Sequence, residues 1–243
     1  MVGSVALFAR NPTIVCGGDR KLLQMSAEPL EAVRFDERGL VPCVMQNWAT
    51  GEVLTLAYMN DGALRRTLET GEMHFYSRSR DELWHKGETS GNVQRVRQIR
   101  YDCDGDALVA LVEPAGPACH TGQRSCFYRD LNGTADAAVD APPAEGEPAL
   151  AAHEATGALE RTLEDRRDGR PEGSYTVELL ADLVAYALRV REEAEEVARA
   201  AASESDERVA EEAADVLYHL QVLLLSRGVP IGDVLETLNG RRS

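Results

Sequence analysis

The sequence of 243 residues contains no long apolar run and only 5% aromatic residues. No stretch approaches the length of about 18 apolar residues that a membrane-spanning helix requires, so we expect no membrane span. The apolar residues 1–8 lack a basic segment and are too short for the hydrophobic part of a secretory signal. These absences favour a cytoplasmic protein.

Positive charge is scarce relative to negative charge. The chain has 26 lysines and arginines against 41 aspartates and glutamates, which gives a net charge of −15. Such a chain repels nucleic acid, so we expect no nucleic-acid partner. It also repels a free nucleotide unless carboxylates hold divalent cations that reverse the local field. The alternative is that acidic helices only keep the protein in solution.

Cysteine is uncommon and odd in number, with Cys16, Cys43, Cys103, Cys119 and Cys126. An odd number without a secretory signal argues against a disulfide framework. The last three cysteines fall within 24 residues, which indicates metal or redox chemistry.

The composition divides the chain into four segments. Residues 1–30 have weak patterning and are interpreted as an N-terminal extension, with Met25 as an alternative initiator. Residues 31–131 are rich in strand patterns, residues 132–155 consist mostly of small, acidic and proline residues, and residues 156–243 have helical spacing. We therefore expect an α+β protein, with a β-rich N-terminal domain joined by a flexible linker to an all-α helical bundle.

Local patterns predict individual elements. Residues 53–58 and 108–112 are strand-like runs with turn residues on either side. A helix over residues 60–70 begins at Asn60 or Asp61 as N-cap and stops at Gly71. Two apolar stripes mark the helical half: Leu179, Leu183, Tyr186, Val190, Ala194 and Val197, then Val209, Ala213, Val216, Leu220 and Leu223.

Aspartates alternate with a cysteine at residues 102–106. In an extended segment, Asp102, Asp104 and Asp106 would project from one face and Cys103 from the other. Carboxylates suit Mg²⁺ and thiolates suit Zn²⁺. The alternative is that the aspartates are solvent-exposed residues of a turn at the end of a strand.

The three clustered cysteines, Cys103, Cys119 and Cys126, are one ligand short of a closed tetrahedral zinc site. The open position is what a catalytic zinc needs for the water whose pKa it lowers. His120 is a candidate catalytic acid or base, or a fourth ligand that would make the zinc structural. Buried cysteines without a metal are a further alternative.

Residues 75–91 combine glycine, serine, arginine and lysine, a composition that suits a loop holding a phosphate group. Its candidate binding residues are Arg78, Ser79, Lys86, Ser90 and Gly91. Lys86 is one of only two lysines against 24 arginines, which suggests that a compact ammonium is needed there.

Together these motifs resemble phosphoribosyl-AMP cyclohydrolase over residues 35–131. The residues are Ser77-Arg-Ser-Arg80, Trp84-x-Lys-Gly-Glu-x-Ser-Gly91, Asp102-Cys-Asp-x-Asp106, Gly116-Pro-x-Cys-His-Thr-Gly122 and Ser125-Cys-Phe127. The resemblance implies hydrolytic opening of the adenine ring between N1 and C6. It also implies Zn²⁺ on Cys103, Cys119 and Cys126, Mg²⁺ on the three aspartates, and a homodimer whose zinc sites take cysteines from both subunits.

Carboxylates gather at helical spacing in the C-terminal half. Glu192 and Glu193 lie four and three residues before Glu196, and Glu212 lies three before Asp215, so each pair shares a helix face. Like charges so spaced destabilise a helix unless a cation lies between them. Two such helices packed antiparallel would converge these carboxylates on Mg²⁺; the alternative is a solvated acidic face.

This half resembles phosphoribosyl-ATP pyrophosphohydrolase over residues 159–242, through Ser174-Tyr-Thr, Glu192-Glu-x-x-Glu196 and Glu212-x-x-Asp-Val-Leu-Tyr-His219. The family usually has Lys-x-Gly before the glutamate pair, where this chain has Arg189-Val-Arg191. The resemblance implies cleavage of phosphoribosyl-ATP to phosphoribosyl-AMP and pyrophosphate.

The two resemblances imply the second and third steps of histidine biosynthesis in one chain, with Zn²⁺ and Mg²⁺ as cofactors and nucleotides as substrates. One alternative is a general nucleoside triphosphate pyrophosphohydrolase fused to a zinc nucleotide deaminase. Another is a non-enzymatic zinc module joined to a helical oligomerisation domain.

Overall fold

The structure is a computed structural model that describes residues 28–129, 150–181 and 183–241. Most of the expected extension, including Met25, and most of the expected linker lie outside the described residues. The described part begins with a short 3-10 helix, η1 (Glu28–Ala32), in which Leu30 packs against the core of the first domain.

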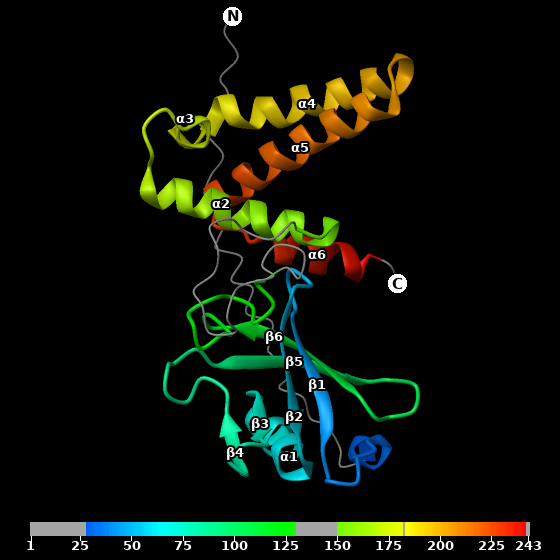
Figure 1. Ribbon diagram of the computed structural model, residues 1–243. Coiled ribbons are helices and arrows are strands. Elements are labelled where there is room, and N and C mark those ends of the chain that lie inside the picture. Colours follow the sequence, from blue (N-terminus) through cyan, green and yellow to red (C-terminus); the bar gives the residue numbers. More distant parts are fainter. Residues whose placement is uncertain (1–27, 130–149, 182, 242–243) are drawn as a thin grey trace, which may run out of the picture.

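The first domain is built on a four-stranded sheet, which Figure 1 shows below the helices. Its strands are β1 (Val41–Asn47), β2 (Val53–Met59), β5 (Gln94–Tyr101) and β6 (Leu108–Pro114), in the order β2-β1-β6-β5. β1 and β6 are parallel, and the other neighbouring pairs are antiparallel. A separate hairpin joins β3 (His74–Ser77) to β4 (Glu82–His85). The strands predicted over residues 53–58 and 108–112 are confirmed.

The core of this domain lies on one side of the sheet. In β1 the side chains of Val41, Cys43 and Met45 are fully buried, while the residues between them are partly exposed. This alternation follows from the two-residue repeat of a strand. Burial raises the pKa of the Cys43 thiol to about 12, so Cys43 acts as a small apolar core residue.

Helix α1 (Asp61–Thr70) begins and ends where its sequence predicts. The side chain of Asn60 accepts a hydrogen bond from the backbone N–H of Ala63, which makes Asn60 the N-cap. Gly71 ends the helix in the left-handed conformation, with φ of 71°, and donates its N–H to the carbonyl of Thr67.

Residues 102–106 do not take the extended form that would place the aspartates and Cys103 on opposite faces; they take the turn form that the sequence left as the alternative. These residues form the turn between β5 and β6. Gly105 has φ of +78°, and a Cβ atom there would lie 2.2 Å from the carbonyl oxygen of Ala32. The turn therefore requires glycine, and the alternation of side chains that an extended strand would impose does not apply.

In the described part of the second half, every secondary-structure element is a helix. This part contains η2 (Ala152–Glu154), α2 (Ala155–Gly169), α3 (Tyr175–Ala181), α4 (Leu183–Ser203), α5 (Asp206–Ser226) and α6 (Ile231–Gly240). The first predicted apolar stripe extends over α3 and α4, and the second lies on α5. The expected α+β class, with a β-rich part followed by a helical part, is confirmed. None of the described helices is long and apolar enough to span a membrane.

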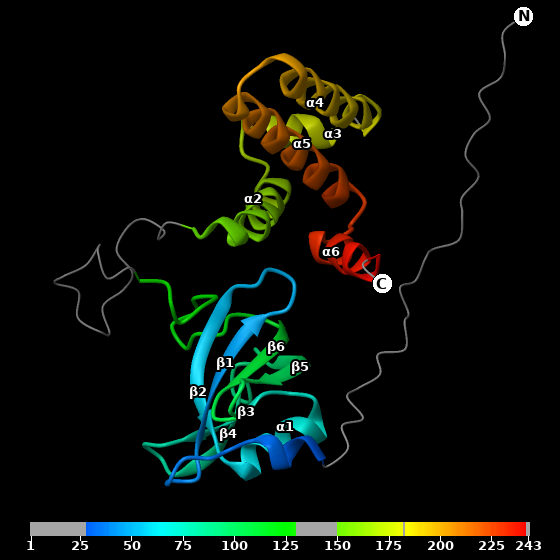
Figure 2. The ribbon, with the colours of Figure 1, turned by 90° about the vertical axis from the view of Figure 1, so that its right-hand side faces the viewer.

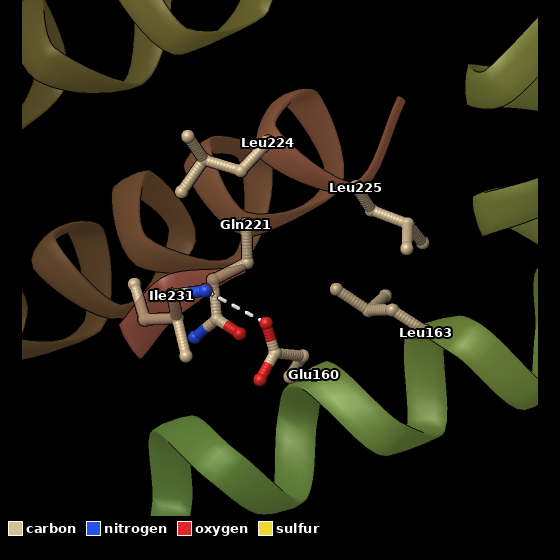
Figure 3. A pocket seen from close by; sticks show the side chains of 6 residues that line it. All are labelled: Glu160, Leu163, Gln221, Leu224, Leu225 and Ile231. Atoms are coloured by element: carbon tan, nitrogen blue, oxygen red, sulfur yellow. Dashed lines mark hydrogen bonds between the residues drawn. The ribbon is translucent and has the colours of Figure 1, made fainter. Parts of the chain in front are cut away.

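Helices α2 and α6 are tied together by one carboxylate. Glu160 on α2 accepts a hydrogen bond of 2.7 Å from the backbone N–H of Ile231, the first residue of α6, as Figure 3 shows. A carboxylate is favoured at a helix N-terminus, where N–H groups lack partners within the helix. Leu163 and Gln221 line the same small pocket, and burial there raises the pKa of Glu160.

Replacing Glu160 by Gln tests this buried carboxylate. Because the folded-state pKa of Glu160 is raised, the stability of the native protein decreases as pH rises through that pKa and the carboxylate ionises. The amide oxygen of glutamine can still accept from Ile231. We expect Glu160→Gln to match the native protein below pH 4.5, the ordinary glutamate value, and to exceed it at neutral pH.

Urea unfolding followed by circular dichroism over a pH series measures this difference. Identical pH dependence of the two proteins would contradict the prediction.

Candidate functional sites

A loop after β6 brings two of the predicted cysteines together. Within the loop, the N–H of Cys119 donates to the carbonyl of Gln123 at 3.0 Å. The N–H of Cys126 donates to the carbonyl of Leu54 in β2 at 2.7 Å, and the Ser125 hydroxyl donates to Val53 O at the same distance. The Cys119 and Cys126 thiols interact directly. We call residues 118–126 the cysteine loop.

The surroundings of Cys119 favour its thiolate. Although burial acts in the opposite direction, hydrogen bonds from Thr121 lower the pKa of Cys119, with smaller contributions from Cys126 and the charge of Lys86. The Thr121 hydroxyl lies 3.1 Å from the Cys119 sulfur. Thiolates are the form of cysteine that binds metals, so this pair could supply two ligands to a soft metal ion.

Cys103 lies elsewhere in the same chain. It is exposed in the β5–β6 turn, at the start of β6, whereas the cysteine loop follows the end of β6. Among the described residues, no group of three close metal-ligating side chains includes a cysteine. The three thiols therefore do not meet within one chain.

The three aspartates of the β5–β6 turn do meet. One carboxylate oxygen from each of Asp102, Asp104 and Asp106 lies within 4.8 Å of the others, and all three residues are exposed. The negative charges of Asp104 and Asp102 raise the pKa of Asp106. This geometry could hold a hard divalent cation, which prefers carboxylate oxygens.

The predicted phosphate-binding residues divide into two groups. Arg78 and Ser79 are exposed in the turn between β3 and β4, where the Arg78 guanidinium lies 3.9 Å from the centre of the Tyr58 ring. Ser90 and Gly91 are exposed in the loop after β4. Lys86 differs from these four because its side chain is buried.

Lys86 belongs to the surroundings of the cysteine loop. It is 7% exposed, its ammonium lies 5.4 Å from the centre of the Trp84 ring, and burial lowers its pKa. The Cys126 and Cys119 thiols favour the charged form of Lys86. His120, the predicted acid or base, is exposed beside Cys119, with its Nδ1 atom 3.9 Å from the sulfur.

A cavity of about 290 Å³ lies beside the cysteine loop. One ion pair forms part of its wall: Arg124 of the loop donates to both carboxylate oxygens of Glu52, at 2.7 and 3.2 Å. Sequence reasoning missed this pair because the partners are 72 residues apart. The cavity is lined by Asn47, Glu52, Leu54, Pro114, Ala115, Gly116, Pro117 and Arg124.

In the helical half, three of the five predicted carboxylates gather. Oxygens of Glu193 on α4 and of Glu212 and Asp215 on α5 lie within 4.8 Å of one another. The other two pair with arginines on their own helix: Glu192 lies 3.1 Å from Arg189 and Glu196 lies 2.6 Å from Arg199. Within the cluster, Glu212 pairs with Arg208 of α5. The three gathered carboxylates could hold a divalent cation.

His219 lies beside this cluster. It is part of the motif that resembles the pyrophosphohydrolase family, but it is not among the site residues predicted from the sequence. It is 5% exposed, and its Nε2 atom lies 3.5 Å from a carboxylate oxygen of Glu193. Because His219 lies seven residues after Glu212, the two residues are on one face of α5. This spacing could have identified His219 from the sequence.

The unusual Arg191 fits the helix without distortion. It lies within α4, is exposed, and forms an i,i+4 ion pair of 3.4 Å with Glu195. The backbone at this position is an ordinary helix, so it has no need of the conformational freedom of glycine.

Comparisons with known proteins assign both halves to hydrolase families. Residues 55–128 match the family model of phosphoribosyl-AMP cyclohydrolase, and residues 156–242 match that of phosphoribosyl-ATP pyrophosphohydrolase. The fold and the two matches define a two-domain hydrolase.

Similar proteins carry both domains in one chain. The chain is 50% identical over 214 residues to the histidine biosynthesis bifunctional protein HisIE of Bacillus subtilis, which covers 88% of this chain and 96% of the relative. It is 47% identical over 210 residues to the HisIE protein of Thermus thermophilus, covering 86% and 92%. The chain belongs to the family of histidine biosynthesis bifunctional proteins HisIE.

Removing the guanidinium of Arg124 tests the ion pair beside the cavity. Arg124→Gln leaves the Glu52 carboxylate, whose side chain is 11% exposed, without its cationic partner. We expect a loss of about 1–2 kcal/mol in the free energy of unfolding, less than for a fully buried pair because Arg124 is partly solvated. Faster hydrogen exchange of the Cys126 amide should accompany it.

The matched control is Arg65→Gln, which removes an exposed ion pair with Asp61 and should change stability by less than about 0.5 kcal/mol. Equal effects of the two substitutions would show that the pair does not hold the cysteine loop.

Proposed function

We propose that the chain catalyses two consecutive hydrolyses in histidine biosynthesis. The helical domain, assigned to residues 156–243, cleaves phosphoribosyl-ATP to phosphoribosyl-AMP and pyrophosphate. The β-rich domain, assigned to residues 31–131, then opens the adenine ring of phosphoribosyl-AMP between N1 and C6. The observation that carries the proposal is the presence of both family matches in one chain, each with a cluster of metal-ligating side chains.

The zinc site is proposed to take Cys119 and Cys126 from one subunit and Cys103 from another, in a homodimer. Its support is that one chain pairs Cys119 with Cys126 and holds Cys103 at the far end of β6. Bound Zn²⁺ supplies a water of lowered pKa. The neighbouring His120 is proposed to transfer protons, and its exposed ring is accessible to a substrate.

The binding residues are proposed from charge and exposure. Arg78 and Ser79 of one turn, and Ser90 and Gly91 of another, present a cation, hydroxyls and backbone N–H groups to phosphate. Lys86 is proposed to contact the part of the substrate that reaches the cysteine loop, because its ammonium is buried beside the thiols.

Two magnesium sites are proposed. Asp102, Asp104 and Asp106 form one, and Glu193, Glu212 and Asp215 form the centre of the other. Glu192 and Glu196 are included in the second site because their present ion pairs are exposed, and such pairs contribute little stability. In this acidic chain, bound cations would create the positive potential that a polyphosphate substrate requires.

The direct assay uses phosphoribosyl-ATP with Zn²⁺ and Mg²⁺, and follows pyrophosphate and the ring-opened product together. The proposal expects both to appear in sequence, and expects ordinary nucleoside triphosphates to be cleaved much more slowly. Preference for ordinary triphosphates would favour a general nucleotide pyrophosphohydrolase fused to a zinc deaminase. Absence of both products would favour the non-enzymatic alternative.

Mixing two inactive variants tests the shared zinc site. Cys103→Ser and Cys126→Ser should each abolish ring opening. After unfolding and refolding as an equal mixture, half the dimers contain one chain of each kind, and each of these has one intact site. We expect the mixture to recover about 25% of native ring-opening activity, as random pairing in a twofold-symmetric dimer requires.

A mixture that stays inactive would contradict this arrangement. Mixing Cys119→Ser with Cys126→Ser provides the control, because both substitutions affect the same half of the site and no intact site can form.

Magnesium dependence of stability tests the carboxylate cluster on α4 and α5. Without a cation, removing the charge of Asp215 relieves repulsion, so Asp215→Asn should be at least as stable as the native protein in chelator. Saturating Mg²⁺, at 100 times its dissociation constant, should stabilise the native helical domain by about 2.7 kcal/mol but not Asp215→Asn.

Glu195→Gln is the control, since Glu195 is exposed, pairs with Arg191 and lies outside the cluster. Thermal unfolding with Mg²⁺ and with chelator measures the effect. An equal Mg²⁺ response in native protein and Asp215→Asn would place the cation elsewhere.

A further inference from the structure

The turn between β1 and β2, residues 48–51, contacts the helical half of the chain. The indole N–H of Trp48 donates a hydrogen bond to the carboxylate of Glu236 on α6. In both Figure 1 and Figure 2, the end of the β1–β2 hairpin lies next to α6 and close to α2. We call residues 48–51 the docking turn.

Two helix glycines face the docking turn. A Cβ atom at Gly157 in α2 would lie 2.6 Å from Cγ2 of Thr50, and one at Gly232 in α6 would lie 3.1 Å from Cβ of Ala49. Both glycines lie in the first turn of their helices. Each helix thus lacks a side chain at the point where the docking turn lies closest.

The other glycines of the same helices are different. A Cβ atom at Gly169 in α2 or at Gly240 in α6 would meet no other heavy atom within 4 Å. Close approach to the docking turn is therefore particular to Gly157 and Gly232, and is not a general property of glycines in these helices.

Helices α2 and α6 are joined by a hydrogen bond near the docking turn. The hydrogen bond from Ile231 to Glu160 joins the start of α6 to α2, as Figure 3 shows. Gly232 follows Ile231 directly, and Gly157 lies one helical turn before Glu160. The Glu160 carboxylate therefore fixes the spacing of the two glycine positions that receive the turn.

The docking turn continues directly into the residues that hold the cysteine loop. Its backbone N–H groups at Ala49 and Thr50 donate to the side chain of Asn47, at 2.9 and 3.2 Å. The next residue after the turn, Glu52, forms the ion pair with Arg124. Asn47 and Glu52 both line the cavity beside the cysteine loop.

We propose that α2 and α6 form a docking site for residues 48–51 and that this contact positions the cysteine loop and its cavity for ring opening. Gly157 and Gly232 are positioning residues, which act through the turn, Glu52 and Arg124. The helical domain thereby supports the site of the other domain in addition to its own reaction. The positioning part of this inference rests on the proposed ring-opening function.

The test compares two double variants of the full chain. Gly157→Val with Gly232→Val places side chains where the docking turn lies, whereas Gly169→Val with Gly240→Val makes the same chemical change in the same helices where no atoms are close. Three quantities are measured in each: hydrogen exchange of the Ala49, Thr50 and Cys126 amides, kcat and KM for ring opening, and the rate of pyrophosphate release.

In the first double variant, we expect faster exchange at all three amides and a loss of about tenfold in kcat/KM for ring opening, since small displacements of reacting groups cost rate. Pyrophosphate release should stay within about twofold of native, because the carboxylate cluster lies on other helices and distant changes act independently. The control double variant should match the native protein in every measurement.

A compensating substitution separates positioning from simple damage. Thr50→Gly removes the atoms that a side chain at position 157 would meet, so adding it to the single variant Gly157→Val should restore exchange and ring opening toward native values. Failure of this rescue would overturn the proposed contact between Thr50 and Gly157.

Unchanged amide exchange in the first double variant would overturn docking. Faster exchange with unchanged ring opening would overturn the positioning role. If the native protein opens no ring, the proposed function itself fails, and the exchange measurements still decide whether the turn docks.

Discussion

The position of Cys103 relative to Cys119 and Cys126 is the constraint that decides how the first domain could bind zinc. Cys103 precedes β6, whereas the cysteine loop follows β6 and is held against β2 by the hydrogen bond from the Cys126 N–H to Leu54 O. Zinc–sulfur bonds are about 2.3 Å long, so the thiolates of one zinc site must lie close together. In the described part of one chain, no group of three close metal-ligating side chains includes a cysteine. The proposed zinc site on all three cysteines would therefore need a second chain, and metal binding would then depend on dimer formation.

The two carboxylate clusters account for part of the acidic composition of the chain. Several acidic side chains in the described part of the helical half pair with arginines along the helix surface, and such pairs add little stability. Glu193, Glu212 and Asp215 gather from two helices. Arg208 pairs with Glu212, and a bound cation would offset the repulsion that remains among the three carboxylates. A chain of net charge −15 can then bind anionic nucleotides, provided that the cations are present.

The features that sequence predicts here are local ones. The strands at residues 53–58 and 108–112, and the helix from its Asn60 cap to Gly71, follow from patterns within a few residues. The sequence left two forms open at residues 102–106, extended or a turn. The structure has the turn, in which Gly105 lies against the backbone of Ala32, a contact that no local pattern contains. The Glu52–Arg124 pair and the glycines beside the docking turn also depend on residues distant in sequence, and they emerge only when the fold is known.

The most direct test of the central claim is mild oxidation of metal-free protein in which Cys16 and Cys126 are replaced by Ser. Among the described residues, the thiols that remain are then Cys103, which is exposed, Cys119, which is 7% exposed, and Cys43, which is fully buried. A zinc site shared between subunits predicts a disulfide that links two chains, seen as a covalent dimer on a non-reducing gel. A disulfide formed within a single chain, with monomer mobility, would contradict it.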